Sequence, residues 1–205
     1  MFTLSPYGNY GEPATISYRY DFPSEPTSYI EIEKITNTTQ WVAPEDGYFK
    51  FIGLAKSGDG GSNDSWNTTV YGGSGGTGGI VASVFRLQKN DVVSITITNN
   101  VTIKSSNETA TATSGGNGTG GKITHPTGWS GDHGKGGAAG SASGGNLANV
   151  TGRVGQNGAS SGAGSSYTNS YSGYSTTSGA GGANNSGTNA YAVILRGNTS
   201  TPSPQ

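Results

Sequence analysis

The 205-residue sequence contains no cysteine, so disulfide bonds and thiolate chemistry are both excluded. Charged residues make up only 11% of the chain, and its formal net charge is −1. No basic patch is visible, which argues against a nucleic-acid partner. No apolar run is long enough to cross a membrane, and residues 1–6 lack the basic and apolar regions of a signal peptide. We therefore expect neither nucleic-acid binding nor membrane insertion.

Catalytic and metal-binding patterns are also scarce. Carboxylates are few and scattered, so no pair suited to glycosidase chemistry is evident. The stretch from Gly72 to Gly76 matches a nucleophile-elbow pattern, but no helical pattern follows it. The two histidines, His125 and His133, lie near Asp132 without a further ligand at metal-binding spacing. The sequence predicts that the protein is not an enzyme and that it uses no metal or cofactor.

Glycine is the most conspicuous component, with 37 residues concentrated in 58–79 and 115–187. From Gly128 to Gly140 it recurs at every third position, and both regions repeat this spacing. A period of three matches polyproline II geometry, in which one side then carries no Cβ atoms and another backbone can approach closely. We expect a bundle of short extended polyglycine II helices. A flexible low-complexity segment is the alternative, and the phased triplets count against it.

Segments with alternating or continuous apolar residues flank the glycine regions and predict β-strands. The expected strands are 14–22, 29–35, 48–55, 80–87, 92–98, 101–104 and 189–196. Strands before and after the glycine regions are expected to pair across a long sequence separation. No stretch is typical of an amphipathic helix. The predicted fold is all-β, a β-sandwich whose glycine-rich insertions pack as a polyglycine II helix bundle.

The composition divides the chain into three parts. Residues 1–37 are expected to form N-terminal strands or an attachment segment, and residues 197–205 a flexible tail. The β-sandwich and its two glycine regions, 58–79 and 115–187, occupy residues 38–196 between them.

Three motifs resemble those of the glycine-rich adhesins at the fibre tips of tailed phages. The first is Trp41-Val42-Ala43-Pro44 followed by Gly47-Tyr48-Phe49-Lys50-Phe51, which leads into a glycine run. The second is the segment from Leu87 to Ile95, and the third is the segment from Asn189 to Leu195 that follows the last glycine run. The resemblance covers roughly residues 38–196. The glycine runs here are shorter than a clean bundle would need, and serine and asparagine interrupt them more often.

The resemblance implies a host-attachment protein of the virion, located at the tail tip and therefore working outside cells. Stacked polyglycine II helices would display loops that recognise a bacterial surface receptor, either a protein or a glycan. Other virion or tail proteins would be its partners, and fibre symmetry favours a homotrimer by analogy.

Aromatic residues in the spacers between glycine runs are the candidate receptor contacts. Residues 165–178 are rich in tyrosine, serine, glycine and asparagine, the residue types that dominate antibody paratopes. Large rings also stack on sugars and fill receptor pockets. The alternative is that the rings cover a glycine bundle that has few other large side chains. The candidates are Tyr167, Tyr171 and Tyr174, followed by Trp129, Trp66 and Tyr71.

Two other functions are compatible with the same pattern. The chain could be a structural virion component, a fibre segment or capsid decoration protein whose rings face a neighbouring subunit. It could also be an ice-binding protein, since some antifreeze proteins use a similar glycine helix bundle. The large rings and the flanking strands argue against the ice-binding alternative.

Overall fold

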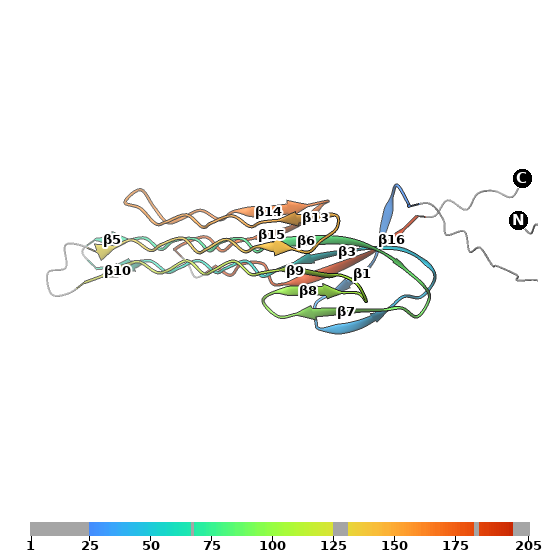
Figure 1. Cartoon of the computed structure of the whole chain (residues 1–205). Coiled ribbons are helices and arrows are strands. Elements are labelled where there is room, and N and C mark those ends of the chain that lie inside the picture. Colours follow the sequence, from blue (N-terminus) through green and yellow to red (C-terminus); the bar gives the residue numbers. More distant parts are fainter. Residues whose placement is uncertain (1–24, 67, 125–130, 183–184, 199–205) are drawn as a thin grey trace, which may run out of the picture.

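The computed structural model describes residues 25–66, 68–124, 131–182 and 185–198. The molecule is elongated, with the main strands at one end and narrow coiled segments extending from them (Figure 1). The described residues contain strands and no helix, which confirms the predicted all-β class. They also contain no helix that is long and apolar enough to cross a membrane.

The first sheet has five strands, each antiparallel to its neighbours. Its order is β1 (Tyr29–Ile35), β16 (Tyr191–Gly197), β3 (Gly47–Leu54), β6 (Ile80–Leu87) and β13 (Ala148–Val150). The last strand of the chain, β16, lies between the early strands β1 and β3. The predicted pairing of strands across the glycine regions is therefore confirmed.

The second sheet also has five antiparallel strands, and three smaller two-stranded sheets accompany it. Its order is β12 (Ala142–Ser143), β9 (Thr109–Ala112), β8 (Val101–Lys104), β7 (Val92–Ile97) and β2 (Thr39–Val42). The two-stranded sheets pair β4 (Asp64–Ser65) with β5 (Thr69–Val70), β10 (Lys122–Ile123) with β11 (Gly131–Asp132), and β14 (Thr168–Tyr171) with β15 (Tyr174–Thr177).

The two large sheets share one hydrophobic core. Alternate residues of β3, such as Phe49 and Phe51, contribute to it together with Ile95 of β7 and Ile103 of β8. The indole ring of Trp41 packs edge-on against both phenylalanine rings, at centroid distances of 5.0 Å and 5.4 Å. Because side chains alternate between the faces of a strand, the intervening residues form a separate apolar cluster on the outer face of the first sheet.

Most of the expected strands are confirmed, and the differences have physical causes. The segments 29–35, 80–87 and 101–104 match strands of the structure, and the bounds of 48–55, 92–98 and 189–196 differ by one or two residues. The expected strand 14–22 lies outside the described residues. The sequence prediction missed the shorter strands of the two large sheets, β2, β9, β12 and β13, because so few residues show little alternation of apolar and polar side chains.

The residues between the large strands are joined by backbone hydrogen bonds whose direction repeats every three residues. We call residues 71–79 the central glycine segment. Its residues Gly73, Gly76 and Gly79 donate to the carbonyls of Thr119, Gly116 and Thr113, over 2.9–3.0 Å. The intervening Ser74 and Thr77 donate in another direction, to the carbonyls of Gln156 and Arg153. The central glycine segment is thus bonded to different neighbours on different sides.

Neighbouring segments bond to the carbonyls of the central glycine segment with the same period. The amides of Gly134, Gly137 and Gly140 donate to Tyr71, Ser74 and Thr77, and those of Gly58 and Gly61 donate to Gly76 and Gly73. The contacts leave no room for a side chain at the glycines. A Cβ atom on Gly76 would lie 2.0 Å from the carbonyl oxygen of Ala138, and one on Gly75 would lie 2.1 Å from that of Gly58.

Polar side chains complete the hydrogen bonding where an amide faces no neighbouring carbonyl. The buried hydroxyl of Ser57 accepts from the amide of Gly78 over 3.0 Å, and that of Thr77 accepts from the amide of Arg153 over 2.6 Å. Asn63 accepts in the same way from Gly72. The serine, threonine and asparagine residues that interrupt the glycine runs therefore satisfy buried or partly buried backbone donors that would otherwise lack a partner.

The two ends of the described chain can be compared with the expected division into an N-terminal segment, a central domain and a C-terminal tail. Residues 29–35 belong to the first sheet through their pairing with β16, and residues 1–24 lie outside the described part of the chain. At the other end, β16 continues to Gly197, and the amide of Asn198 donates to the carbonyl of Ser28 over 2.9 Å. Both ends of the described chain therefore lie beside each other at the strand end of the molecule (Figure 1).

Candidate functional site

The far end of the molecule, opposite the chain ends, is built from two short hairpins and a turn (Figure 1). We call it the distal tip, and it comprises residues 64–66, 68–71, 122–124, 131–133 and 159–162. The carboxylate of Asp64 accepts a hydrogen bond from the amide of Ile123 over 3.0 Å, which ties the β4–β5 hairpin to β10. The turn is closed by reciprocal hydrogen bonds between Ala159 and Gly162.

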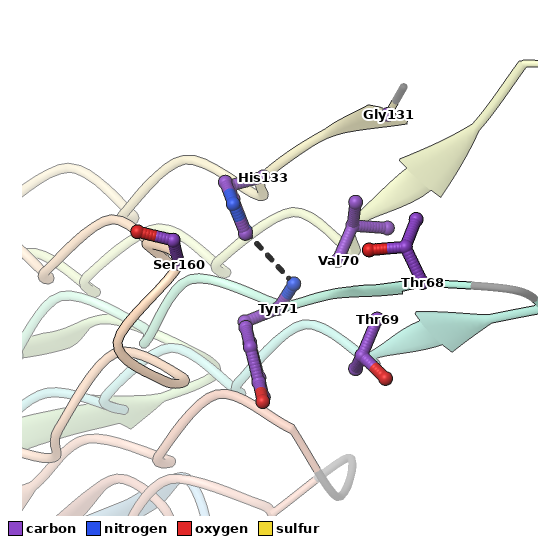
Figure 2. A pocket seen from close by; sticks show the side chains of 7 residues that line it. All are labelled: Thr68, Thr69, Val70, Tyr71, Gly131, His133 and Ser160. Carbon is purple, nitrogen blue, oxygen red and sulfur yellow. Dashed lines mark hydrogen bonds between the residues drawn. The ribbon is translucent and has the colours of Figure 1, made fainter. Parts of the chain in front are cut away.

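A cavity of about 460 Å³ lies in the distal tip, within the usual size range of small-ligand pockets. Figure 2 shows its lining, which comes from all three parts of the tip. The lining residues are Thr68, Thr69, Val70, Tyr71, Gly131, His133 and Ser160. None of these side chains carries a charge when the histidine is neutral.

Two aromatic rings of this lining, those of Tyr71 and His133, lie in nearly parallel planes. Their interplanar angle is 8° and their centroids are 6.0 Å apart, and Figure 2 shows both rings edge-on. The Nδ1 atom of His133 accepts a hydrogen bond from the backbone amide of Tyr71 over 3.0 Å. An accepting Nδ1 fixes the neutral tautomer, so Nε2 carries the proton and can donate.

Three hydroxyl groups of the lining have no hydrogen-bond partner in the described part of the chain. They belong to Thr68, Thr69 and Ser160, all of which are exposed. A free hydroxyl can both donate and accept. Together with the Nε2 proton of His133, the cavity therefore offers several uncharged hydrogen-bonding groups beside an aromatic surface.

Trp66 lies at the same tip, directly after β4. Its side chain is 60% exposed, and its backbone amide donates to the carbonyl of Thr68 over 3.0 Å. The structure thus brings together two of the predicted receptor contacts, Trp66 and Tyr71. Trp129, a third, lies outside the described residues, as does His125.

The other three candidates, Tyr167, Tyr171 and Tyr174, lie on or beside the β14–β15 hairpin. The prediction of a spacer loop over 165–178 is therefore wrong for much of its length. The turn between the strands holds Ser172 and Gly173 at φ angles of 50° and 84°. Positive φ at both positions is typical of a type I′ turn, but serine at the first of them is a weak sequence signal.

The hairpin tyrosines are half-buried against other parts of the molecule. Tyr171 and Tyr174 pack on the outer apolar cluster of the first sheet, which includes Ile52 and Val193. The hydroxyl of Tyr174 donates to the carboxylate of Glu31 over 2.5 Å. Tyr167 contacts the guanidinium group of Arg153, 5.1 Å from the ring centroid. Whether these rings also contact a receptor stays a prediction.

Burial shifts the pKa values of several side chains on this outer surface. Burial, with the hydrogen bond to Glu31 and its charge as further causes, raises the pKa of Tyr174 to about 12. Burial also raises the pKa of Tyr171 and lowers that of Lys50, whose ammonium lies 5.2 Å from the Tyr171 ring centroid. The ammonium also lies 5.7 Å from the ring centroid of Tyr29, and its cation–π contact with Tyr171 helps to hold the hairpin on the sheet.

Sequence reasoning did not find the hydroxyl groups of the tip cavity, and it considered His133 only as a metal ligand. In the described part of the chain, no three acidic or histidine side chains come together as a metal site would need. The available signal was the position of Thr68 and Thr69 between Trp66 and Tyr71. Ser160 gave no signal, because only the folded chain brings it to this hairpin.

Comparisons of the chain with protein-family models, with curated proteins and with solved structures found no match.

Proposed function

We propose that this protein is a non-enzymatic adhesin of a phage or phage-like tail, which binds a bacterial surface receptor through its distal tip. In this proposal it is a virion protein that works outside cells and is joined to other tail proteins near its chain ends. The resemblance of residues 38–196 to glycine-rich fibre-tip adhesins supports the assignment, and the separation of the tip from the chain ends agrees with it.

The scaffold of this adhesin would be a β-sandwich that carries a polyglycine II helix bundle. The core shared by the two large sheets supports the first part of this description. The three-residue repeat of hydrogen-bond directions in the central glycine segment supports the second. Such a bundle would hold the tip rigidly, because its backbone groups bond to several neighbouring segments.

The observation that carries the proposal is the gathering of exposed aromatic and polar groups at the distal tip. Trp66 is exposed, and Tyr71 lines a cavity at the same end. Aromatic residues dominate the energetics of recognition surfaces because they bury much area at a low cost in side-chain entropy.

The test measures binding of the labelled full-length protein to a panel of bacterial strains. We expect Trp66→Ala and Tyr71→Ala each to weaken cell binding by roughly 30-fold, as hot-spot truncations do. Val154→Ala is the matched control, because Val154 is 63% exposed and lies outside the tip. Undiminished binding of both tip variants to a strain that the wild-type protein binds would contradict the proposal.

A second candidate function, a structural virion component, is favoured by the exposed apolar residues of β1. This strand forms an edge of the first sheet, and its residues Ile30 and Ile32 are 54% and 42% exposed. Within the described part of the chain no strand pairs with its outer side, and such an edge with apolar side chains is suited to contact with a neighbouring subunit. The mass of the protein in solution separates the two functions, since an obligate assembly without cell binding would favour the structural component.

A further inference from the structure

We infer that the cavity of the distal tip binds one neutral sugar unit of a surface glycan. This inference rests on the proposed function and names the chemistry that the tip would recognise. It is drawn from the seven described residues that line the cavity of about 460 Å³.

The lining excludes other ligand classes on chemical grounds. Among the described residues, no lysine, arginine or carboxylate lines the cavity, so they offer no ion pair to a phosphate, a carboxylate or an amine. A purely apolar ligand would cover the hydroxyls of Thr68, Thr69 and Ser160 without replacing their bonds to water, which costs free energy. The ligand that suits the cavity is uncharged and carries several hydroxyl groups.

A sugar ring can bind both to the hydroxyl groups of the cavity and to its aromatic rings. Its hydroxyl groups can donate to and accept from the free hydroxyls of Thr69 and Ser160, and they can accept from Nε2 of His133. Its C–H face can lie against the ring of Tyr71 or His133, as apolar surfaces do on aromatic faces. Figure 2 shows Ser160 on one side of the two rings and Thr68 and Thr69 on the other.

The hydrogen bond between His133 and Tyr71 fixes this arrangement before a ligand arrives. Because Nδ1 accepts from the Tyr71 amide over 3.0 Å, the imidazole ring cannot rotate freely and Nε2 stays available as a donor. A binding group that is already in place loses less entropy when the ligand binds. His133 is therefore assigned both a donor role and a role in shaping the aromatic surface.

The first experiment screens the full-length protein and its variants on an array of purified bacterial polysaccharides, both neutral and acidic. We expect binding to neutral glycans, with a five- to tenfold loss in Thr69→Val, which keeps the side-chain shape and removes the hydroxyl. His133→Asn should lose more, because its amide oxygen can still accept from the Tyr71 amide while the ring and the Nε2 proton are gone. Thr96→Val, on the exposed face of β7, is the control and should bind as the wild type does.

The second experiment treats a bound bacterial strain with periodate, which cleaves sugar diols, or with a protease. Loss of binding after periodate but not after protease supports the inference. Loss after protease alone, or binding to charged glycans alone, overturns the inference while the adhesin function stands. If no strain of the panel is bound, the proposed function fails and the inference fails with it. Equal glycan binding by Thr69→Val, His133→Asn and wild type, with unchanged melting temperatures, would place the sugar site elsewhere.

Discussion

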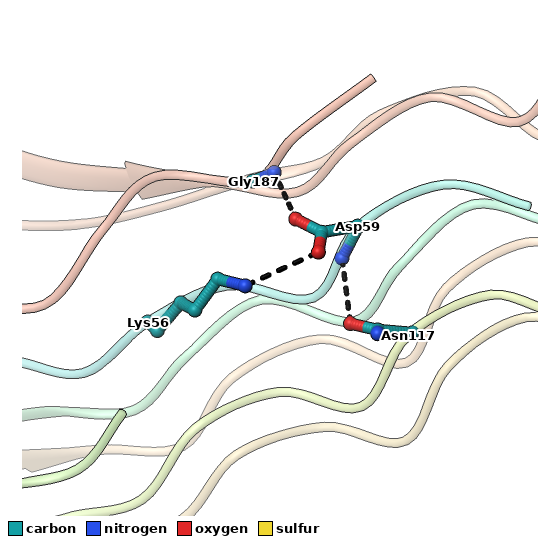
Figure 3. A network of polar contacts seen from close by, with 4 residues as sticks. All are labelled: Lys56, Asp59, Asn117 and Gly187. Carbon is teal, nitrogen blue, oxygen red and sulfur yellow. Dashed lines mark hydrogen bonds and ion pairs between the residues drawn. The ribbon is translucent and has the colours of Figure 1, made fainter. Parts of the chain in front are cut away.

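The carboxylate of Asp59 accepts a hydrogen bond from the backbone amide of Gly187 over 2.9 Å, although 128 residues separate them in sequence. Its other oxygen forms an ion pair with Lys56 at 3.1 Å, and its own amide donates to the side chain of Asn117 (Figure 3). One acidic residue thus connects three extended segments of the glycine-rich part.

This network predicts an acid-sensitive contribution to stability. The hydrogen bond from Gly187, and secondarily the contacts with Lys56, hold the pKa of Asp59 below its ordinary value of 3.8, although burial opposes them. A group whose pKa is lowered by folding stabilises the fold above its unfolded pKa, and the contribution disappears as the pH falls through the folded pKa. Wild type should melt at a higher temperature than Asp59→Asn at pH 7, and the gap should close below about pH 4. A gap that is the same at pH 7 and at about pH 2.5 would rule this contribution out.

The contact of Tyr174 with Glu31 predicts the opposite dependence in alkali. The folded pKa of Tyr174, about 12, lies above its ordinary value of 10.0. A raised pKa means that the contribution is complete below about pH 10 and is lost as the pH rises through about 12. Relative to Tyr174→Phe, which cannot ionise, wild type should lose melting temperature between pH 9 and about pH 11.5. Parallel melting curves for the two proteins over this range would show that the hydroxyl does not stabilise the hairpin.

The close backbone contacts predict that glycines of the central glycine segment cannot be replaced singly. A Cβ atom on Gly76 would lie 2.0 Å from a backbone oxygen, so Gly76→Ala must displace a neighbouring segment. We expect it to lower the free energy of unfolding by about 3 kcal/mol, the upper range for overpacking. The control is Gly47→Ala, because a Cβ atom there would meet its nearest neighbour at an ordinary 3.8 Å. Chemical denaturation measures both, and equal stabilities would contradict the packing described here.

Two buried threonines provide a matched test of the side-chain acceptors. The hydroxyl of Thr77 accepts from the amide of Arg153, whereas the buried hydroxyl of Thr176 has no partner. Valine preserves the shape of threonine, so Thr77→Val leaves a partly buried amide unsatisfied and should cost about 1–3 kcal/mol. Thr176→Val removes an unsatisfied group and should be neutral or stabilising. The reverse order of stabilities in urea would refute the role given to these side chains.

The sequence predicted the large strands well because their apolar residues alternate or run together, as in residues 80–87 and 92–97. The spacing of glycine at every third position can also be read directly from the sequence, because it depends only on the order of residues along the chain. What the sequence did not predict is the use of Ser57, Thr77 and Asn63 as acceptors. Which amide lacks a neighbouring carbonyl depends on which segments lie side by side in the folded chain. The sequence of a single segment does not show which neighbours it will have.

The candidate site was predicted only in part for a similar reason. Aromatic content identified Trp66 and Tyr71, but it weighted the tyrosines of residues 165–178 more heavily, and Tyr171 and Tyr174 are half-buried against the first sheet. Exposure cannot be read from residue type. The tip cavity joins Thr69 to Ser160 across the fold, so no local pattern could have indicated it.

Amide hydrogen exchange in the central glycine segment tests the central claim most directly, that interlocked glycine backbones form a rigid support for the tip. The amides of Gly73, Ser74, Gly76 and Thr77 donate to carbonyls of other segments, so they should exchange as slowly as those of strand β3. Exchange of these amides at the rate of an unfolded chain, while β3 remains protected, would show that the support does not exist in solution.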